Sequence, residues 1–252
     1  MNAGKAQMRR EKSRYDRPMT GKDSPNRVWL ALSFAAGLLC VYLAAHLVTP
    51  PSPTHPLTGR RIAGIATNTS WLDRAEREGE EQPDRALDLI GIESGSSVAD
   101  IGAGSGYMTL RIAGRVGPAG KVYANDLQPA MLQAVQDKVR KAGLANVVLV
   151  QGTEQDARLP DGAIDLALMV DVYHELWHPQ AMLQSIRRSL KPGGRLVLVE
   201  YRKEDPRIPI ADAHRMSVAD ARREVEAEGF AFDRAIEGLP RQHIIVFSRA
   251  GP

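Results

Sequence analysis

The pattern of apolar and polar positions after residue 85 predicts a regular alternation of strands and helices. Short apolar runs that suit buried strands occupy residues 97–101, 121–126, 146–152, 163–171 and 195–201. Between them, apolar residues recur at helical spacing in residues 107–116, 129–143 and 179–190. A helix over 217–230 follows. Two strands, 231–237 and 242–249, come last, and we expect them to form a hairpin. This order predicts an α/β fold with a seven-stranded, mostly parallel sheet covered by helices on both faces.

Capping patterns predict where two helices begin, one over residues 71–82 and the one over 217–230. Ser70 is followed three residues later by Asp73, and Ser217 is followed in the same way by Asp220. The first pattern predicts a charged helix over residues 71–82, packed at the edge of the domain.

Ahead of the domain, residues 28–48 form an apolar stretch without Lys, Arg, Asp or Glu. As a helix it would span roughly 30 Å, which is enough to cross a bilayer. The stretch is apolar on every face and is followed by a proline-rich segment, so we expect an uncleaved transmembrane anchor rather than a core helix. The predicted organisation is therefore a basic tail (1–27), an anchor (28–48), a linker (49–69) and one domain (70–252).

The charge of the chain is concentrated in the tail. Residues 1–27 carry a net charge of +5, and the remaining residues carry −2. We therefore expect no nucleic-acid partner, because no basic excess is left to neutralise phosphates. The positive-inside rule places the tail in the cytoplasm and the domain on the other side of the membrane. Cys40 is the only cysteine, so a disulfide framework and a cysteine-based site are excluded.

Three glycines mark a ligand-binding turn where the first strand ends. The sequence DIGAGSG, Asp100 to Gly106, places Gly102, Gly104 and Gly106 between a strand and a helix. Such a turn lets backbone N–H groups and the positive end of the helix approach a ligand closely. The even spacing by two disfavours an NAD site, which uses G-x-G-x-x-G.

With an acid before the glycines and another at the end of the second strand, the chain resembles class I S-adenosylmethionine-dependent methyltransferases. The resemblance covers about residues 85–200 and implies a Rossmann-like fold with S-adenosyl-L-methionine as cofactor. It assigns the ribose hydroxyls to Asp126, with Leu127 beside it, and the adenine amino group to the loop 152–156. Many relatives have Asp directly after the glycine of that loop, whereas this chain reads GTEQD, so either Glu154 or Asp156 faces adenine. Asp171, at the end of the fourth strand, is expected near the methionine part of the cofactor.

The complete chain also resembles a bacterial group of membrane-anchored or exported methyltransferases whose substrates are not defined by the match. This narrower likeness rests on the anchor, on HPLTGRRIA, on WLDRAEREGEEQP and on LVEYRKEDP. A cytoplasmic cofactor and a domain placed outside the cytoplasm conflict, and the sequence leaves this conflict open.

The segment HELWH, residues 174–178, matches the H-E-x-x-H pattern of zinc peptidases. That pattern needs both histidines on one helix face, but Pro179 disfavours helical geometry at His178. We therefore expect a loop that forms one wall of the ligand crevice, with no metal ion bound.

Methyl transfer needs alignment of the acceptor and, for a hydroxyl or a carbon acid, removal of a proton. His174 is the predicted catalytic base, with Glu175 or Tyr173 orienting it or binding substrate. Methylation of amino groups in nucleic acids and some proteins is disfavoured because the N/D-P-P-Y motif is absent, and arsenite methylation is disfavoured because it requires several thiols and Cys40 is the only cysteine. The predicted substrate is a small molecule that is methylated on oxygen or carbon. Lipid-soluble molecules are among the candidates, because a membrane anchor would concentrate them. The alternative to an enzyme is a non-catalytic module that binds S-adenosylmethionine or S-adenosylhomocysteine.

Overall fold

The computed structural model describes residues 53–251, so the basic tail and the predicted anchor lie outside the described residues. Within this range, none of the helices combines the length and the apolar character that crossing a membrane requires.

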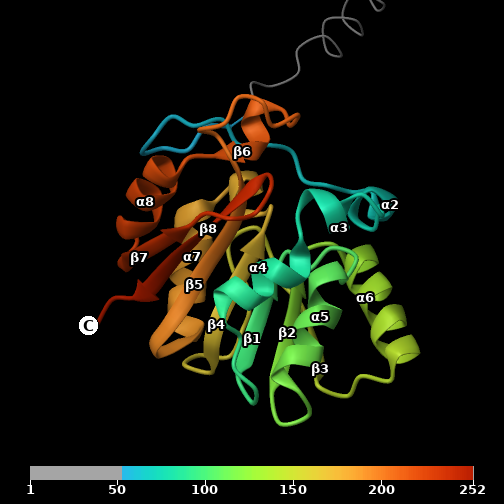
Figure 1. The fold of residues 1–252 in the computed structure, drawn as a ribbon. Coiled ribbons are helices and arrows are strands. Elements are labelled where there is room, and N and C mark those ends of the chain that lie inside the picture. Colours follow the sequence, from blue (N-terminus) through green and yellow to red (C-terminus); the bar gives the residue numbers. More distant parts are fainter. Residues whose placement is uncertain (1–52, 252) are drawn as a thin grey trace, which may run out of the picture. The chain divides into compact units, whose positions relative to one another are not determined.

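One sheet with strand order β3-β2-β1-β4-β5-β8-β7 forms the centre of the folded unit (Figure 1). Strands β1 to β5 run parallel, whereas β8 is antiparallel to β5 and β7. A short strand, β6, pairs with β5 off this path. The bounds are β1 Ser97–Ile101, β2 Lys121–Asp126, β3 Val147–Gln151, β4 Ile164–Val170, β5 Leu190–Arg202, β6 Arg215–Met216, β7 Phe230–Ile236 and β8 Gln242–Arg249. The mostly parallel sheet and the closing hairpin are confirmed, and β6 is an addition to the seven predicted strands.

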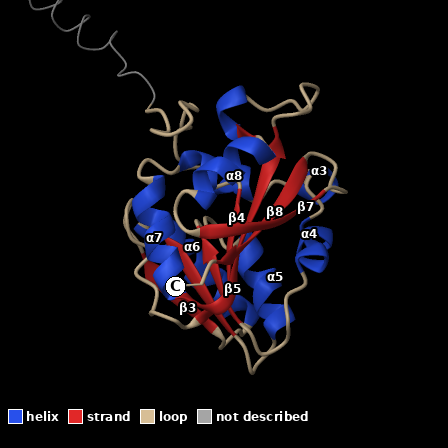
Figure 2. Cartoon of the chain, turned by 90° about the vertical axis from the view of Figure 1, so that its left-hand side faces the viewer, coloured by secondary structure: helices blue, strands red, loops and turns tan. Residues whose placement is uncertain are grey.

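Helices cover both faces of this sheet, as the two views show (Figures 1 and 2). One apolar layer joins the sheet to α4 and α5, and the other joins it to α7 and α8. The helices and 3-10 turns are α2 Thr69–Leu72, α3 Arg77–Glu80, α4 Pro83–Ile90, α5 Tyr107–Val116, α6 Pro129–Ala142, η1 Tyr173–Glu175, α7 Pro179–Ser189, η2 Asp212–His214 and α8 Val218–Glu226.

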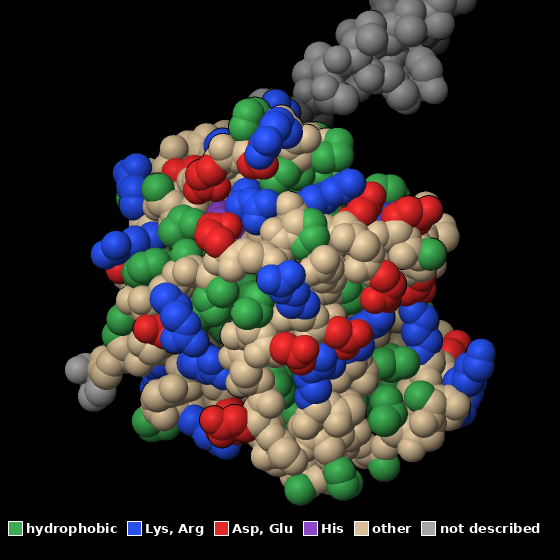
Figure 3. Space-filling model, viewed as in Figure 1, with side chains coloured by type: hydrophobic (Ala, Val, Ile, Leu, Met, Phe, Trp, Pro, Cys, Tyr) green, Lys and Arg blue, Asp and Glu red, His purple; other side chains and the backbone are tan. Residues whose placement is uncertain are grey.

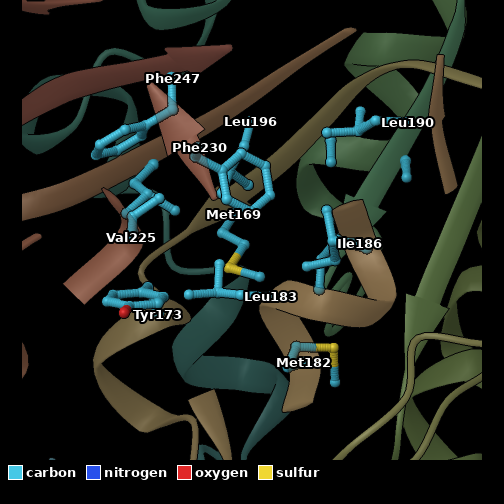
Figure 4. Close-up of a cluster of buried hydrophobic side chains, with 14 of the residues drawn as sticks. Met169, Tyr173, Met182, Leu183, Ile186, Leu190, Leu196, Val225, Phe230 and Phe247 are labelled. Carbon is cyan, nitrogen blue, oxygen red and sulfur yellow. The ribbon is translucent and has the colours of Figure 1, made fainter. Parts of the chain in front are cut away.

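The central strands bury alternate residues in opposite layers. In β4, Leu166 and Leu168 pack toward α4 and α5, whereas Ala167 and Met169 pack toward α7 and α8. The second layer is shown in Figure 4, where Met169 lies beside Leu183 of α7. Burial on both faces explains why these strands read as continuous apolar runs rather than as alternating ones.

Ion pairs on the surface contribute little to the stability of the folded unit. On the face shown in Figure 3, acidic and basic side chains are intermixed. Several form exposed ion pairs, such as Arg115 with Asp88 at 3.0 Å. Pairs of this kind contribute about 0–1 kcal/mol each, so the two apolar layers carry most of the stabilisation.

The start of the domain differs from the prediction. Residues 71–82 form two short helices, α2 and α3, instead of one, and Asn68 rather than Ser70 caps α2, because its side chain accepts from the Ser70 N–H. The chain leaves the helix at Asp73, whose carboxylate accepts from the Ser105 hydroxyl at 2.6 Å and pairs with Lys138. By contrast, Ser217 caps α8 as predicted, since its hydroxyl accepts from the Asp220 N–H at 3.0 Å.

The second difference concerns the predicted linker, since residues 53–69 belong to the folded unit. Ile62 and Ala63 are buried, and the Ala63 N–H donates to the carbonyl of His174 at 3.0 Å. Arg60 forms a buried, two-pronged ion pair with Glu224 of α8 and also donates to the His174 carbonyl. The segment 53–69 therefore fixes the loop that contains HELWH, through hydrogen bonds to the His174 carbonyl.

Candidate functional site

The candidate site lies at the carboxyl ends of the parallel strands. The chain order along the sheet reverses at β1, which has β2 on one side and β4 on the other, and ligands of open α/β sheets bind at such a point. A cavity of ≈ 430 Å³ opens there. Its walls include the turn after β1, the ends of β2 and β4, the 3-10 turn η1 and the 3-10 turn η2.

The glycine turn fits a ligand that lies directly against the backbone. Gly102, Gly104 and Gly106 all have positive φ angles, between +53° and +81°. A Cβ atom at Gly102 would come within 2.6 Å of the Val172 side chain, and one at Gly104 within 2.8 Å of Leu72. A side chain at either position would collide with its neighbours, so the turn requires glycine. Its exposed backbone therefore suits a cofactor that lies directly against the turn.

Two buried acids support this turn. The carboxylate of Asp100 accepts from the Thr109 hydroxyl of α5 at 2.5 Å, and burial raises its pKa to about 6. The carboxylate of Asp126 accepts from the N–H groups of Gly104 and Gln128, at 2.9 and 2.8 Å, while burial raises its pKa. Each Asp126 oxygen keeps a second lone pair, and the residue lines the cavity, so the geometry allows it to accept from a ribose diol.

The loop 152–156, which the resemblance assigns to adenine, places its two candidate acids differently. Leu127 and Glu154 line the cavity, and Glu154 also lies 3.6 Å from His178. Asp156 is not among the lining residues. Its carboxylate instead accepts from the Ser185 hydroxyl and the Arg158 N–H, which fixes the loop. The geometry therefore favours Glu154 as the residue facing adenine.

Asp171 supplies an unpaired oxygen at the opposite end of the cavity. It has a φ of 55°, directly after β4. Its Oδ2 accepts from the Gln242 amide at 2.8 Å, whereas Oδ1 is buried without a partner among the described residues. Burial, and then the nearby Glu81 and Glu200, raise the pKa of Asp171 well above its usual value. A buried acceptor at this place suits an ammonium group such as that of a bound methionine moiety.

His174 is the centre of a buried polar cluster. Its Nδ1 lies 2.5 Å from Glu200 Oε2, and its Nε2 lies 3.0 Å from Nδ1 of His214. Burial opposes protonation of His174, but the carboxylate of Glu200, followed by Glu175 and Asp171, outweighs it and raises the pKa. For His214, burial and the neighbouring His174 lower the pKa. The carboxyl of Glu175 is also largely enclosed, and burial raises its pKa to about 7.

The predicted catalytic residues therefore occupy different environments. His174 and Glu175 line the cavity, but Tyr173 does not. The Tyr173 ring is fully buried in the layer between the sheet and α7 and α8, which Figure 4 shows. The predicted contact between Tyr173 and substrate is therefore wrong, because its ring packs in the core. Its backbone N–H donates to Oε1 of Glu200 at 2.9 Å, next to the bond between Glu200 and His174.

The geometry of HELWH excludes the pattern of a zinc peptidase. Tyr173–Glu175 form a 3-10 turn, and α7 begins only at Pro179, so His174 and His178 do not share a helix face. His178 is about half exposed and lies beside Glu154. The predicted loop and cavity wall are both observed.

Several cavity residues carried no specific prediction from the sequence. Glu200 follows the apolar run 196–199 of β5 and is fully buried, so an acid at the end of that run is the sequence signal that points to it. Nothing in the sequence around His214 shows that it meets His174. Arg74, Glu81 and Tyr201 form a hydrogen-bonded group in the cavity wall, joined at Glu81 by distances of 2.7 and 2.9 Å.

Comparison with known proteins gives the class of this site. Residues 98–194 match the family model described as "Methyltransferase domain". The ubiquinone/menaquinone biosynthesis C-methyltransferase UbiE of Ectopseudomonas mendocina is 35% identical over 118 residues, which cover 46% of each chain. UbiE of Pseudomonas savastanoi pv. phaseolicola is 34% identical over 119 residues, covering 47% of this chain and 46% of the relative. The chain thus spans about half the length of the curated relatives that it matches.

Solved structures extend the similarity to the fold. An S-adenosylmethionine-dependent methyltransferase from Aquifex aeolicus superposes with a TM-score of 0.69 and 28% identity, over 73% of this chain and 100% of that chain. The cyclase SpnF superposes with a TM-score of 0.57 at 18% identity, over 84% and 93% of the two chains, which shows the fold alone.

The strand order, the glycine turn and these comparisons together define the class. The chain carries a class I, S-adenosylmethionine-dependent methyltransferase domain, and the cofactor of this domain is S-adenosyl-L-methionine.

Proposed function

We propose that the whole protein transfers the methyl group of S-adenosylmethionine to an oxygen or carbon atom of a small, lipid-soluble molecule. The observation that carries this proposal is the composition of one cavity. The glycine turn and Asp126 line it together with the polar cluster of His174, Glu175 and His214. A cofactor cradle and titratable groups in one cavity are what methyl transfer to a weak nucleophile needs.

The residues of the chain divide the work of binding. The glycine turn would let the cofactor lie against the backbone, Asp126 would accept from the ribose, and Asp171 would face the ammonium group. When bound, S-adenosylmethionine supplies the electrophilic methyl group. The chain must then align the acceptor atom with that methyl group and, where the acceptor carries a proton, take this proton on a titratable group of the cavity wall.

The acceptor side of the cavity supports an apolar substrate. Apolar side chains also line the cavity, among them Ile65, Leu72, Leu176, Trp177, Pro209 and Ile210. Trp177 is about half exposed and stands at the opening. The UbiE relatives are named as C-methyltransferases of quinone biosynthesis, which supports methylation of a ring or lipid-like acceptor in this chain too.

The proposal includes attachment to the membrane through residues 28–48. Its support is the apolar stretch in the sequence and the likeness to anchored methyltransferases. Attachment would concentrate a lipid-soluble acceptor near the domain, which is the physical advantage of an anchor for such chemistry.

The test is calorimetric titration of the full-length, detergent-solubilised chain with S-adenosylmethionine and, separately, with NAD. We expect binding of S-adenosylmethionine alone, weakened about 10- to 100-fold by Asp126→Ala, since hydrogen bonds to a carboxylate contribute about 1.5–3 kcal/mol. Asp137→Ala is the matched control, because that acid is exposed on α6 and does not line the cavity. Absence of binding by a folded chain would overturn the proposal. Binding without methyl transfer to any of a panel of phenols, quinols and enols would favour a non-catalytic binding module.

A further inference from the structure

The polar cluster in the cavity has the arrangement of a metal site. Among residues 53–251, His174, Glu175 and His214 are the one group whose imidazole and carboxylate ligand atoms converge, all within 4.8 Å of one another. The three residues come from two turns, η1 and η2, that lie 40 positions apart in the chain. The fold, rather than a local motif, brings them together.

The supporting contacts select which nitrogen of His174 is available. Its Nδ1 lies 2.5 Å from the carboxylate of Glu200, which is fully buried in β5. A ring whose Nδ1–H donates to a carboxylate presents Nε2 as a lone pair, and metal-binding histidines are usually oriented in this way. Nε2 faces the cluster, because its neighbours are His214 Nδ1 at 3.0 Å and Glu175 Oε1 at 4.0 Å.

The distances between the ligand atoms agree with one shared ion. Zinc–nitrogen bonds of about 2.0–2.1 Å and bond angles of about 90–110° place two nitrogens roughly 2.8–3.4 Å apart. The observed 3.0 Å between Nε2 of His174 and Nδ1 of His214 lies within this range. The Glu175 carboxylate lies 4.0 Å from Nε2 of His174 and within 4.8 Å of the other ligand atoms, so sharing one ion requires a small rotation of its side chain.

We propose that Nε2 of His174, Nδ1 of His214 and the carboxylate of Glu175 bind one divalent transition-metal ion of the zinc type. Two imidazoles and one carboxylate favour Zn²⁺ and its first-row neighbours over Mg²⁺ and Ca²⁺, which prefer all-oxygen sites. Because all three residues line the cavity, the remaining coordination positions face the acceptor side. There the ion would hold an acceptor oxygen and lower its pKa, a role that rests on the proposed methyl transfer.

This site is distinct from the zinc-peptidase pattern of the sequence. It uses the first histidine and the glutamate of HELWH as ligands, whereas a peptidase uses the glutamate as a base and His178 as the second ligand. His178 is about half exposed and lies beside Glu154, outside the cluster. The chain therefore contains its own matched control, since removing His178 deletes a histidine of the same motif without touching the proposed ligands.

The competing explanation is a direct hydrogen bond between the two imidazoles with no ion involved. Both arrangements place the two nitrogens about 3 Å apart, so metal binding itself must be measured. Co²⁺ provides a readout besides activity, because its visible absorption reports coordination by protein ligands.

The experiment treats the full-length protein with chelator, removes the chelator and titrates it with Zn²⁺ by calorimetry and with Co²⁺ by absorption. We expect one ion per chain with micromolar or tighter affinity. His214→Ala and Glu175→Gln should each weaken Zn²⁺ binding at least 100-fold, and Glu200→Gln about 10- to 100-fold. His178→Ala should leave affinity and spectrum unchanged.

Three outcomes overturn the inference: no stoichiometric binding, equal affinity in His214→Ala and the unaltered protein, or an equal loss in His178→Ala. Titration of the same samples with S-adenosylmethionine reports folding and separates the two proposals. Cofactor binding without metal binding would refute the metal site alone. Metal binding without cofactor binding would refute the proposed function and leave the ion site standing.

Discussion

At the scale of single residues, the glycine turn depends on space as well as on backbone freedom. Gly102 has a φ of +69° and its missing Cβ would lie 2.6 Å from Val172, whereas Gly143, with a φ of +66°, has no atom within 4 Å of that position. Alanine at either place costs about 1–2 kcal/mol in backbone energy. We predict that Gly102→Ala weakens S-adenosylmethionine binding at least 10-fold and, because of the added clash with Val172, lowers stability more than Gly143→Ala, which leaves the affinity unchanged. Calorimetry and thermal unfolding of both variants check this, and equal affinities would contradict it.

Asp100 gives a prediction about pH and stability. Burial raises its pKa from 3.8 to about 6, so the folded chain binds the proton more tightly than the unfolded chain does. Stability from this group is therefore fully present below about pH 4 and falls as the pH rises to about 6. The difference between the two pKa values corresponds to roughly 3 kcal/mol. Asn at this position keeps the acceptor for Thr109 without the charge, so we predict that the melting temperature of Asp100→Asn relative to the unaltered chain rises by several degrees between pH 4 and pH 7.

Thermal unfolding of both chains without cofactor, at pH 4, 5, 6 and 7, measures this difference. Asp88→Asn is the control, because Asp88 is an exposed acid on α4. Parallel curves for Asp100→Asn and the unaltered chain would show that the buried carboxyl does not set the pH dependence.

At the scale of elements, one ion pair joins the segment 53–69 to α8 and lies beside the loop that contains HELWH. Arg60 and Glu224 are both buried, and Arg60 also reaches the His174 carbonyl. Removing one partner leaves a buried charge, so we predict that Glu224→Leu lowers the free energy of unfolding by about 3–5 kcal/mol. The double change Arg60→Met with Glu224→Leu should recover most of the loss. Urea unfolding measures both, with Glu226→Ala as the exposed control at about 0.5 kcal/mol. A double variant as unstable as the single one would show that the pair matters through geometry rather than charge.

The same elements show how far sequence reasoning reaches. Strands β1 and β2 and helix α5 have the predicted bounds, because periodicity and glycine turns fix them locally. The split between α2 and α3 was missed because Asp73 is recruited by Ser105 and Lys138, contacts that exist only after folding. The partners of Arg60 lie 114 and 164 residues away, beyond any local pattern.

In the candidate site, too, some residues are predicted by local motifs and others are brought together only by folding. Gly102, Gly104 and Asp126 follow from motif spacing and do lie together in the cavity. The burial of Tyr173 and the meeting of His174 with His214 depend on how the turns pack across the sheet end. A motif gives the cofactor side of this site, whereas the acceptor side is assembled from distant segments.

At the scale of the whole molecule, the apolar stretch 28–48 and the basic tail before it predict an anchored protein with its domain outside the cytoplasm. We predict that the full-length chain sediments with membranes and resists extraction by carbonate, and that deletion of residues 28–48 releases it. Replacing the stretch with 21 residues of alternating Leu and Ala is the matched control, which should keep the chain in the membrane. Full-length protein recovered without detergent would contradict the anchor.

The side of the membrane decides how the domain obtains its cofactor. We predict that a phosphatase reporter fused after Pro252, which is active only outside the cytoplasm, shows activity, because eight basic residues precede the stretch and only Arg60 and Arg61 follow it closely. Reversing this imbalance, by changing the basic residues of the tail to Gln and adding Lys residues in 49–52, should silence the phosphatase and activate a fused cytoplasmic fluorescent reporter. An active cytoplasmic reporter on the unaltered chain would refute the charge-based orientation and place the cavity directly in the compartment where S-adenosylmethionine is made. An active phosphatase would instead require S-adenosylmethionine, a charged sulfonium that cannot cross the bilayer unaided, to be supplied to the domain by transport.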